Sequence, residues 1–216
     1  MFRSLFGKLK FRIDRLVNPP IDAYTTHLPV LIGLASARPV RRVLEFGCGP
    51  FSTLTFLDRS LFPDLVALDS YETDPVWRDM VVKQSGNDPR LQLKVVPAPM
   101  AETIRTTNFE PYDLVFVDDS VTVEERAASV RTAANVSFTH PWLIAHDLEN
   151  PAYRAVVPDR VQRQEFNAFT PFTWVMWNGG DQPQAKLKRI SELIHANHRI
   201  RPHRKAKWKS VFQNAN

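Results

Sequence analysis

Short apolar runs alternate along this chain with longer segments whose apolar positions recur at helical spacing. The short runs predict strands over residues 42–46, 65–70, 91–96, 112–117 and 142–146. The longer segments predict helices over residues 28–37, 52–60, 75–85, 100–107, 123–136 and 184–196. Residues 164–169 and 172–177 are typical of two strands paired as a hairpin.

This alternation predicts a three-layer α/β fold, in which helices cover both faces of a doubly wound, mostly parallel sheet. Such folds bind ligands beyond the carboxyl ends of the strands. Polar residues of this chain gather at those predicted ends, namely Glu45, Gly47, Glu72, Asp118 and Asp147. We therefore expect the functional site at that edge of the sheet.

The length of 216 residues suits one domain with short extensions. We expect an N-terminal helix over 1–20, a catalytic domain over 21–197 and a basic, disordered tail over 198–216. The single cysteine excludes a disulfide framework and a multi-thiolate zinc site. No apolar stretch approaches the roughly 18 residues of a membrane-spanning helix.

The formal net charge of +5 comes from the two ends of the chain. Residues 1–17 carry five Lys/Arg against one Asp, and residues 186–216 carry nine against one Glu, so the body between them is acidic. The first segment predicts an amphipathic basic helix, which packs on its own domain or a partner, or docks on an anionic membrane. For residues 186–216 we expect either a solvated tail or a segment that binds a polyanion such as RNA.

A glycine turn follows the first predicted strand, with Gly47 suited to a tight turn and Gly49 to close approach of a ligand. Ser52 or Thr53 is expected to cap the next helix. Glu72, at the end of the second strand, can accept hydrogen bonds from both hydroxyls of a ribose.

Two features of this turn argue against a dinucleotide. Ser52 stands where the dinucleotide fingerprint has its third glycine, and Glu45 would repel phosphates but suit an ammonium group. No phosphate-binding GxxxxGK[ST] loop occurs.

Four segments together resemble the class I S-adenosylmethionine-dependent methyltransferases. They are Val43–Gly49, Ser70–Trp77, Tyr112–Asp118 and Trp142–Asp147. The resemblance runs from about residue 40 to 180 and implies a seven-stranded Rossmann-like sheet whose last strand is antiparallel. It also implies S-adenosylmethionine as the cofactor.

The resemblance further implies roles for individual residues. Glu45 would lie near the methionine ammonium, Glu72 would bind the ribose, and Asp118 would lie beside the methyl donor. The other residues implied in cofactor binding are Gly47, Gly49, Ser52 and Thr73, with Thr73 and Asp74 bordering the adenine. Tyr24 and His27, which precede the first strand, are implied as substrate contacts.

Methyl transfer requires alignment of the reactants, and an oxygen acceptor often requires a base. Asp118, His146 and Asp147 are the candidate catalytic residues, and strand alternation places His146 and Asp147 on opposite faces of the sheet. Asp118, Asp147 and Asn150 are similar to the Mg²⁺ ligands of catechol-type O-methyltransferases, but two residues separate Asp147 from Asn150 here. We expect no metal at the site, with Mg²⁺ kept as an alternative.

The predicted function is O-methylation of a small-molecule or glycan-type acceptor in the cytoplasm or at the inner face of a membrane. The Asn/Asp-Pro-Pro-Tyr/Phe tetrapeptide typical of amide or base N-methylation is absent after the fourth strand. Two alternatives stay open. One is an RNA methyltransferase recruited by the basic tail, and the other is a non-catalytic scaffold at a membrane surface.

Overall fold

The structure of the chain, a computed structural model, describes residues 23–119, 122–136, 138–179 and 183–214. The amphipathic helix predicted for residues 1–20 lies outside this part of the chain. None of the described helices is both long and apolar enough to cross a bilayer.

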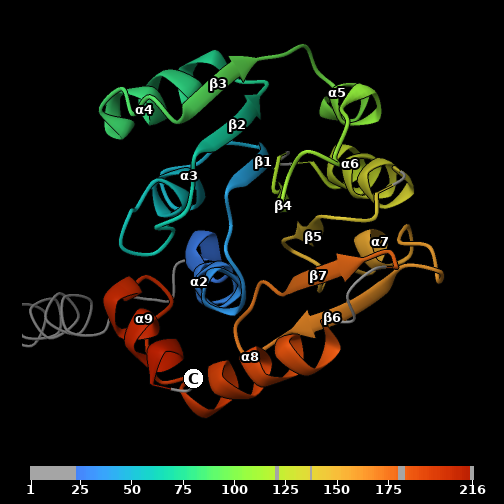
Figure 1. The fold of residues 1–216 in the computed structure, drawn as a ribbon. Coiled ribbons are helices and arrows are strands. Elements are labelled where there is room, and N and C mark those ends of the chain that lie inside the picture. Colours follow the sequence, from blue (N-terminus) through green and yellow to red (C-terminus); the bar gives the residue numbers. More distant parts are fainter. Residues whose placement is uncertain (1–22, 120–121, 137, 180–182, 215–216) are drawn as a thin grey trace, which may run out of the picture.

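A seven-stranded sheet forms the centre of the molecule, with the strand order β3-β2-β1-β4-β5-β7-β6 (Figure 1). Its strands are β1 (Arg42–Phe46), β2 (Ala67–Glu72), β3 (Leu91–Val95), β4 (Leu114–Val117), β5 (Trp142–Ala145), β6 (Gln162–Phe166) and β7 (Thr173–Trp177). Strand β7 pairs antiparallel with both β5 and β6, and every other pair is parallel. The predicted sheet with one antiparallel strand is confirmed.

Helices cover both faces of this sheet (Figure 1). On one face lie α2 (Leu28–Ala37), α3 (Ser52–Phe56), α8 (Gln184–Ala196) and α9 (Lys205–Gln213), and α4 (Pro75–Ser85) packs beside α3. On the other face lie α5 (Met100–Thr106), α6 (Val123–Asn135) and α7 (Pro151–Arg154). A short 3-10 helix, η1 (Ala23–Thr25), precedes α2. Each face has its own core because residues of the central strands alternate between the two.

Local sequence signals explain where several helices begin and end. Asp74 caps α4, because its carboxylate accepts hydrogen bonds from the backbone N–H groups of Val76 and Trp77. Helix α4 ends at Gly86, whose φ of 64° lies in the left-handed region. The bounds predicted for α2, α4 and α8 match those observed.

The prediction of a disordered C-terminal tail is wrong for residues 205–213, which form α9. Trp208 is fully buried, and Phe212 is 2% exposed. Helix α9 packs on α2, where Gly33 leaves room for both Ile190 and Phe212. Although α9 is rich in basic residues, one side of it is apolar and belongs to the core.

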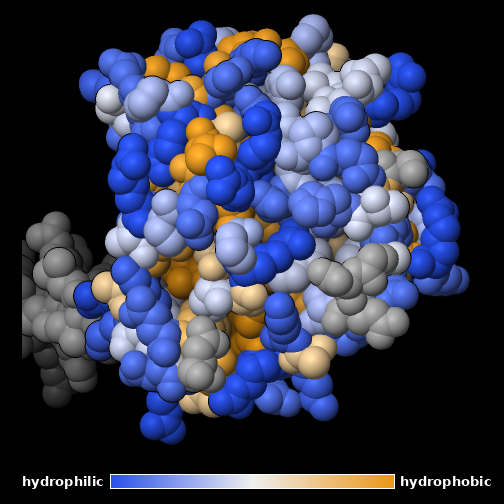
Figure 2. All heavy atoms as spheres, in the orientation of Figure 1, coloured by the Kyte–Doolittle hydropathy of each residue, from blue (hydrophilic) through white to orange (hydrophobic). Residues whose placement is uncertain are grey.

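The sheet order places a topological switch point between β1 and β4, since the chain continues from β1 to β2 on one side and reaches β4 on the other. Ligands of doubly wound folds bind at such a point, beyond the carboxyl ends of the strands. The face of the molecule seen in Figure 2 is mostly hydrophilic, with apolar side chains in scattered patches.

Candidate functional site

The carboxyl ends of four parallel strands bring the predicted site residues to one edge of the sheet. Phe46 pairs with Tyr71 on β2 and with Val117 on β4, and Val117 pairs with Ala145 on β5. The residues that follow these partners are therefore neighbours in space. They are Gly47, Glu72, Asp118 and His146.

Gly47 turns the chain sharply at the end of β1. Its φ is 89°, and its backbone N–H donates to the carbonyl of Tyr71 at 2.9 Å. A Cβ at this position would lie 2.5 Å from the Cα of Asp119 and still closer to the carbonyl oxygen of Asp118. The chain's own loop after β4 therefore requires glycine here. At Gly49, a Cβ would meet the Ser52 hydroxyl at 3.5 Å and no other atom of the described residues within 4 Å.

The prediction that Ser52 or Thr53 caps α3 is wrong. The N-cap position is Phe51, and none of the side chains that the structure describes caps the helix. The hydroxyl of Thr53 instead accepts from the N–H of Gly49 at 3.0 Å and donates to Glu45 at 2.7 Å. Thr53 thus connects the glycine turn to the carboxylate at the end of β1.

Glu45 is a fully buried carboxylate at the floor of this turn. Its Oε2 accepts from the hydroxyls of Thr53 and Ser70, each at 2.7 Å. Its Oε1 has no hydrogen-bond partner among the described residues. Burial raises the pKa of Glu45 to about 7, against the opposing effect of the nearby hydroxyls of Ser52, Ser70 and Thr53. A ligand that brings a positive charge and N–H donors would complete this environment.

We expect Glu45→Gln to stabilise the folded protein at pH 8 relative to the wild type. A carboxyl whose pKa is raised in the folded state loses stability as the pH rises from the unfolded pKa to the folded one. The loss at Glu45, between 4.5 and about 7, amounts to something on the order of 3 kcal/mol. Glutamine is neutral at every pH. The gain in unfolding free energy of Glu45→Gln over the wild type should therefore be near zero at pH 4 and largest at pH 8.

Urea unfolding at both pH values measures this difference. Glu124→Gln, on the exposed first turn of α6, provides a control with the same chemical change. An equal gain for both variants, or none for Glu45→Gln at pH 8, would contradict the assignment of a buried, partly unsatisfied carboxylate.

Glu72 connects the glycine turn to the turn that follows β2. Its Oε2 accepts from the N–H of Cys48 at 3.1 Å, and its Oε1 accepts from the N–H groups of Thr73 and Asp74 at 2.7 and 3.0 Å. The indole N–H of Trp77 donates to the carbonyl of Cys48 and closes the same junction. Glu72 is only 5% exposed, so these hydrogen bonds hold the carboxylate in one orientation.

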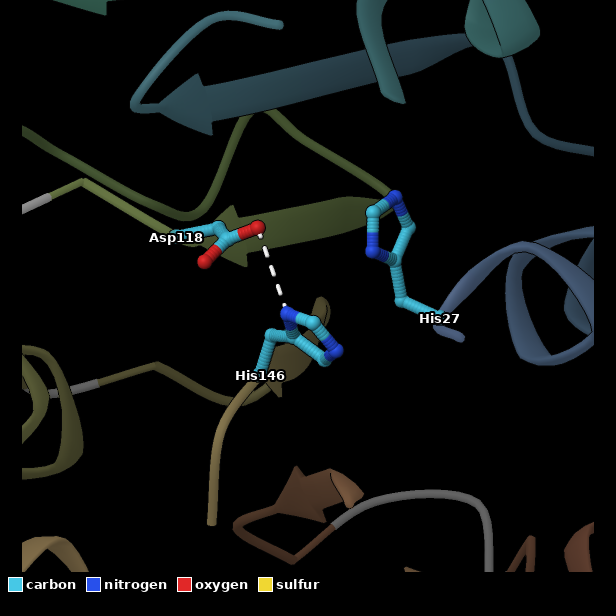
Figure 3. A group of neighbouring side chains, drawn as sticks. All are labelled: His27, Asp118 and His146. Carbon is cyan, nitrogen blue, oxygen red and sulfur yellow. Dashed lines mark ion pairs between the residues drawn. The ribbon is translucent and has the colours of Figure 1, made fainter. Parts of the chain in front are cut away.

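A second group of ionisable side chains lies beyond β4 and β5. Nη1 of Arg126, a buried residue of α6, lies 2.7 Å from Asp118 Oδ1 and 3.1 Å from Asp147 Oδ2. The other oxygens of these carboxylates face Nδ1 of His146. Asp118 Oδ2 lies at 3.4 Å (Figure 3) and Asp147 Oδ1 at 3.3 Å. Each carboxylate is thus shared between a guanidinium and an imidazole.

The charges of this group shift one another's pKa values. Burial alone would raise the pKa of the Asp118 carboxyl, but Arg126 and His146 hold it well below its ordinary value. Burial alone would lower the pKa of His146, but Asp118 and Asp147 hold it above its ordinary value. Burial raises the pKa of neighbouring Asp119 to about 6, although Ser129 donates to it at 2.6 Å.

The expectation that His146 and Asp147 point to opposite faces is wrong. Strand β5 ends at Ala145, one residue earlier than predicted, and Asp147 has a φ of 65°. The alternation of a strand therefore no longer applies, and both side chains reach Asp118 or Arg126.

Thr26 fixes a proton on one ring nitrogen of His146. Its hydroxyl lies 2.8 Å from His146 Nε2 and donates to the carbonyl of Pro171 at 2.9 Å. A hydroxyl has one hydrogen and a carbonyl can only accept, so Nε2–H donates to Thr26. The Nδ1 atom is therefore the nitrogen left to face the two carboxylates.

His27 completes the group from the start of α2. The side chain is 2% exposed, and its ring makes an edge contact with His146 at 4.9 Å between centroids. Burial, followed by the neighbouring His146, lowers the pKa of His27 to about 3, so the imidazole is neutral. Neither ring nitrogen has a hydrogen-bond partner among the described residues. Tyr24, the other predicted substrate contact, lies on η1 and is 70% exposed.

Sequence reasoning missed two residues of this group, Arg126 and Thr26. Arg126 shares a buried helical face with Ser129, Val130 and Ala133. A charged residue at a position of the apolar stripe is unusual unless it is paired, and that signal was available in the sequence. Nothing in the pattern distinguished Thr26.

The oxygen ligands considered for Mg²⁺ do not form a site. Arg126 lies against both Asp118 and Asp147, and the side chain of Asn150 accepts from Ala152 N–H at 3.0 Å as the cap of α7. The residues present therefore do not fit a Mg²⁺ ion held by these three side chains.

A surface hollow of about 350 Å³ lies elsewhere, between α2, α8 and α9. Its lining includes Ser36, Lys186 and Arg189 but none of the residues at the carboxyl edge of the sheet. We therefore place the site by the strand ends and not by this hollow.

Solved structures share this fold at low sequence identity. The O-methyltransferase from Bacillus cereus in complex with SAH has a TM-score of 0.53 and 16% identity, with 78% of this chain and 88% of that chain covered. The O-methyltransferase TomG from Streptomyces achromogenes, in complex with SAM, has a TM-score of 0.52 and 20% identity, with 77% of this chain and 86% of that chain covered. The N-methyltransferase NodS from Bradyrhizobium japonicum has a TM-score of 0.52 and 11% identity, with 76% and 99% covered.

No model of a known protein family matches the sequence, and no curated protein matches it either. The similarity is therefore one of fold, and it includes proteins that are O- and N-methyltransferases alike.

Proposed function

We propose that this chain, which has the fold of class I S-adenosylmethionine-dependent methyltransferases, transfers a methyl group from S-adenosylmethionine to a hydroxyl group of a small-molecule or glycan-type acceptor. When bound, the cofactor supplies a methyl carbon on a sulfonium, whose C–S bond breaks as the bond to the acceptor oxygen forms. The chain's own residues bind the two reactants and exclude water.

The observation that carries this proposal is the unpartnered oxygen of Glu45. It is a buried carboxylate oxygen beneath a glycine turn, at the switch point of the sheet. An ammonium group supplies both the charge and the N–H donors that this oxygen lacks, whereas a phosphate would be repelled. Glu72, fixed at the end of β2, is available to accept from a ribose. Two carboxylates of this kind suit S-adenosylmethionine better than a dinucleotide.

The acceptor would bind beside Asp118, where β4 and β5 end. The imidazole of His27 is neutral and buried, and its ring nitrogens are unpartnered among the described residues, so one of them can form a hydrogen bond with a hydroxyl. Asp118 is ionised and can orient the same group. Because its pKa is low, it would receive the proton only after the acceptor oxygen has been methylated and has become strongly acidic. His146 holds a proton on Nε2 and is better suited to fixing Asp118 and Asp147 than to acting as the base.

Methyl transfer from isotopically labelled S-adenosylmethionine to matched panels of alcohols, sugars and amines tests the proposal. We expect labelled methyl ethers and S-adenosylhomocysteine from hydroxyl acceptors, and none from the Glu72→Ala protein. Transfer to amines with none to hydroxyls would contradict the choice of acceptor. Absence of transfer by a protein that binds S-adenosylhomocysteine would favour the non-catalytic alternative.

A further inference from the structure

We infer that His27, Asp118 and His146 form a binding site for a divalent first-row transition metal ion of the Zn²⁺ type. One ligand atom from each side chain lies within 4.8 Å of the other two. Figure 3 shows the three side chains turned toward a common space, from the start of α2 and from the ends of β4 and β5.

The carboxylates of Asp118 and Asp147 each direct one oxygen to Arg126 and the other to His146. The oxygens on the His146 side remain available as metal ligands. Asp118 Oδ1 and Asp147 Oδ2 face Arg126. Asp118 Oδ2 and Asp147 Oδ1 instead face Nδ1 of His146. Arg126 thus offsets part of the negative charge without using the oxygens on the imidazole side.

His146 is held in the manner of a metal ligand. A ligating histidine usually donates its second ring N–H to another group, which fixes the tautomer and the ring orientation. Here Nε2–H donates to Thr26, which in turn donates to the carbonyl of Pro171. Without an ion, Asp118 and Asp147 favour a second proton on Nδ1, and a bound metal ion would replace that proton. The distance of 3.4 Å from Nδ1 to Asp118 Oδ2 matches the separation of about 3.3 Å between two ligands of a tetrahedral zinc ion.

His27 provides an independent observation. Its imidazole is 2% exposed, yet neither ring nitrogen has a hydrogen-bond partner among the described residues. Buried polar atoms without partners cost free energy and are rare in folded proteins. A metal ion bound by a neutral imidazole would satisfy one of these nitrogens, and no other described polar atom does so.

The ligand chemistry determines the class of ion. Two imidazole nitrogens and a carboxylate suit Zn²⁺, Co²⁺, Mn²⁺ or Fe²⁺, whereas Mg²⁺ and Ca²⁺ prefer oxygen ligands throughout. A bound ion of this class lowers the pKa of a coordinated hydroxyl group. Activation of an oxygen acceptor in this way rests on the proposed function, but the metal site itself does not.

Titration of the full chain, stripped of metal, with Co²⁺ tests the inference directly, because the visible absorption of Co²⁺ reports its ligands and not enzymatic activity. We expect stoichiometric binding with the intense absorption of a low-coordinate site, displacement by Zn²⁺ and no displacement by Mg²⁺. His27→Gln should weaken Co²⁺ binding by at least about tenfold, and Thr26→Val by about 10- to 100-fold.

His140→Gln is the matched control, because His140 also lies near a carboxylate, 3.2 Å from Asp113, but on the exposed surface. It should leave the Co²⁺ spectrum unchanged. Thermal shifts with S-adenosylhomocysteine, measured on the same variants, report the fold and the cofactor site independently. Absence of a Co²⁺ spectrum in the wild type, or an unchanged spectrum in a folded His27→Gln protein, would overturn the metal site and leave the proposed function standing.

Discussion

Glu72→Ala is expected to abolish the thermal stabilisation of the protein by S-adenosylhomocysteine. In the wild type, a ligand at about 100 times its dissociation constant adds about 2.7 kcal/mol, which raises Tm by roughly 5–10 °C for a domain of this size. The substitution removes the carboxylate proposed to accept both ribose hydroxyls. Hydrogen bonds to a charged group contribute about 1.5–3 kcal/mol each, so two of them correspond to a loss of affinity of about 100-fold or more.

The same carboxylate also holds the glycine turn through the N–H of Cys48. The variant therefore needs a control that removes a carboxylate from the same strand without contacting that turn. Asp69 on β2 accepts from the hydroxyl of Tyr112 at 2.8 Å, well away from the strand's carboxyl end. Asp69→Ala should keep the full thermal shift. An unchanged shift in Glu72→Ala would show that the cofactor does not bind at the end of β2.

Gly47→Ala is expected to cost about 3–5 kcal/mol of stability, a large part of the roughly 5–15 kcal/mol typical of a folded domain. Two effects add. The φ of 89° is unfavourable for alanine, and the added Cβ would overlap the backbone of Asp118 and Asp119. Since backbone atoms cannot move aside as a flexible side chain does, β1 and the loop after β4 would have to separate.

Gly86→Ala separates the two effects, because Gly86 also has a positive φ, 64°, but a Cβ there would have no atom of the described part of the chain within 4 Å. It should cost only about 1 kcal/mol. Urea unfolding of both variants measures the difference. Equal losses would mean that the loop after β4 does not lie against the glycine turn.

Much of the fold was predictable because strand and helix periodicity is a local property. The bounds of β1 and α8 agree with those predicted. Helix α9 was not predicted, because the segment is mostly basic and polar and has only two aromatic residues, Trp208 and Phe212, spaced one helical turn apart. Only the docking on α2, with Gly33 beneath it, shows that they belong to the core.

The gathering of the candidate site residues at one edge of the sheet was predictable from topology, and their contacts were not. The rule that ligands bind at the carboxyl ends of parallel strands placed Glu45, Glu72 and Asp118 at one edge. The approach of both His146 and Asp147 to Asp118 and Arg126 accompanies the end of β5 at Ala145 and a positive φ at Asp147. Neither feature has a signature in the residue pattern, so the expected separation of His146 from Asp147 was wrong.

The most direct test of the central claim is calorimetric titration of the wild-type protein with S-adenosylhomocysteine, with NAD⁺ as the competing ligand. The arrangement of Glu45 and Glu72 around the glycine turn predicts saturable binding of one S-adenosylhomocysteine per chain, unaffected by NAD⁺. Binding of NAD⁺ in its place, or no heat of binding with S-adenosylhomocysteine at saturating concentration, would contradict the assignment of this edge of the sheet as a methyl-donor site.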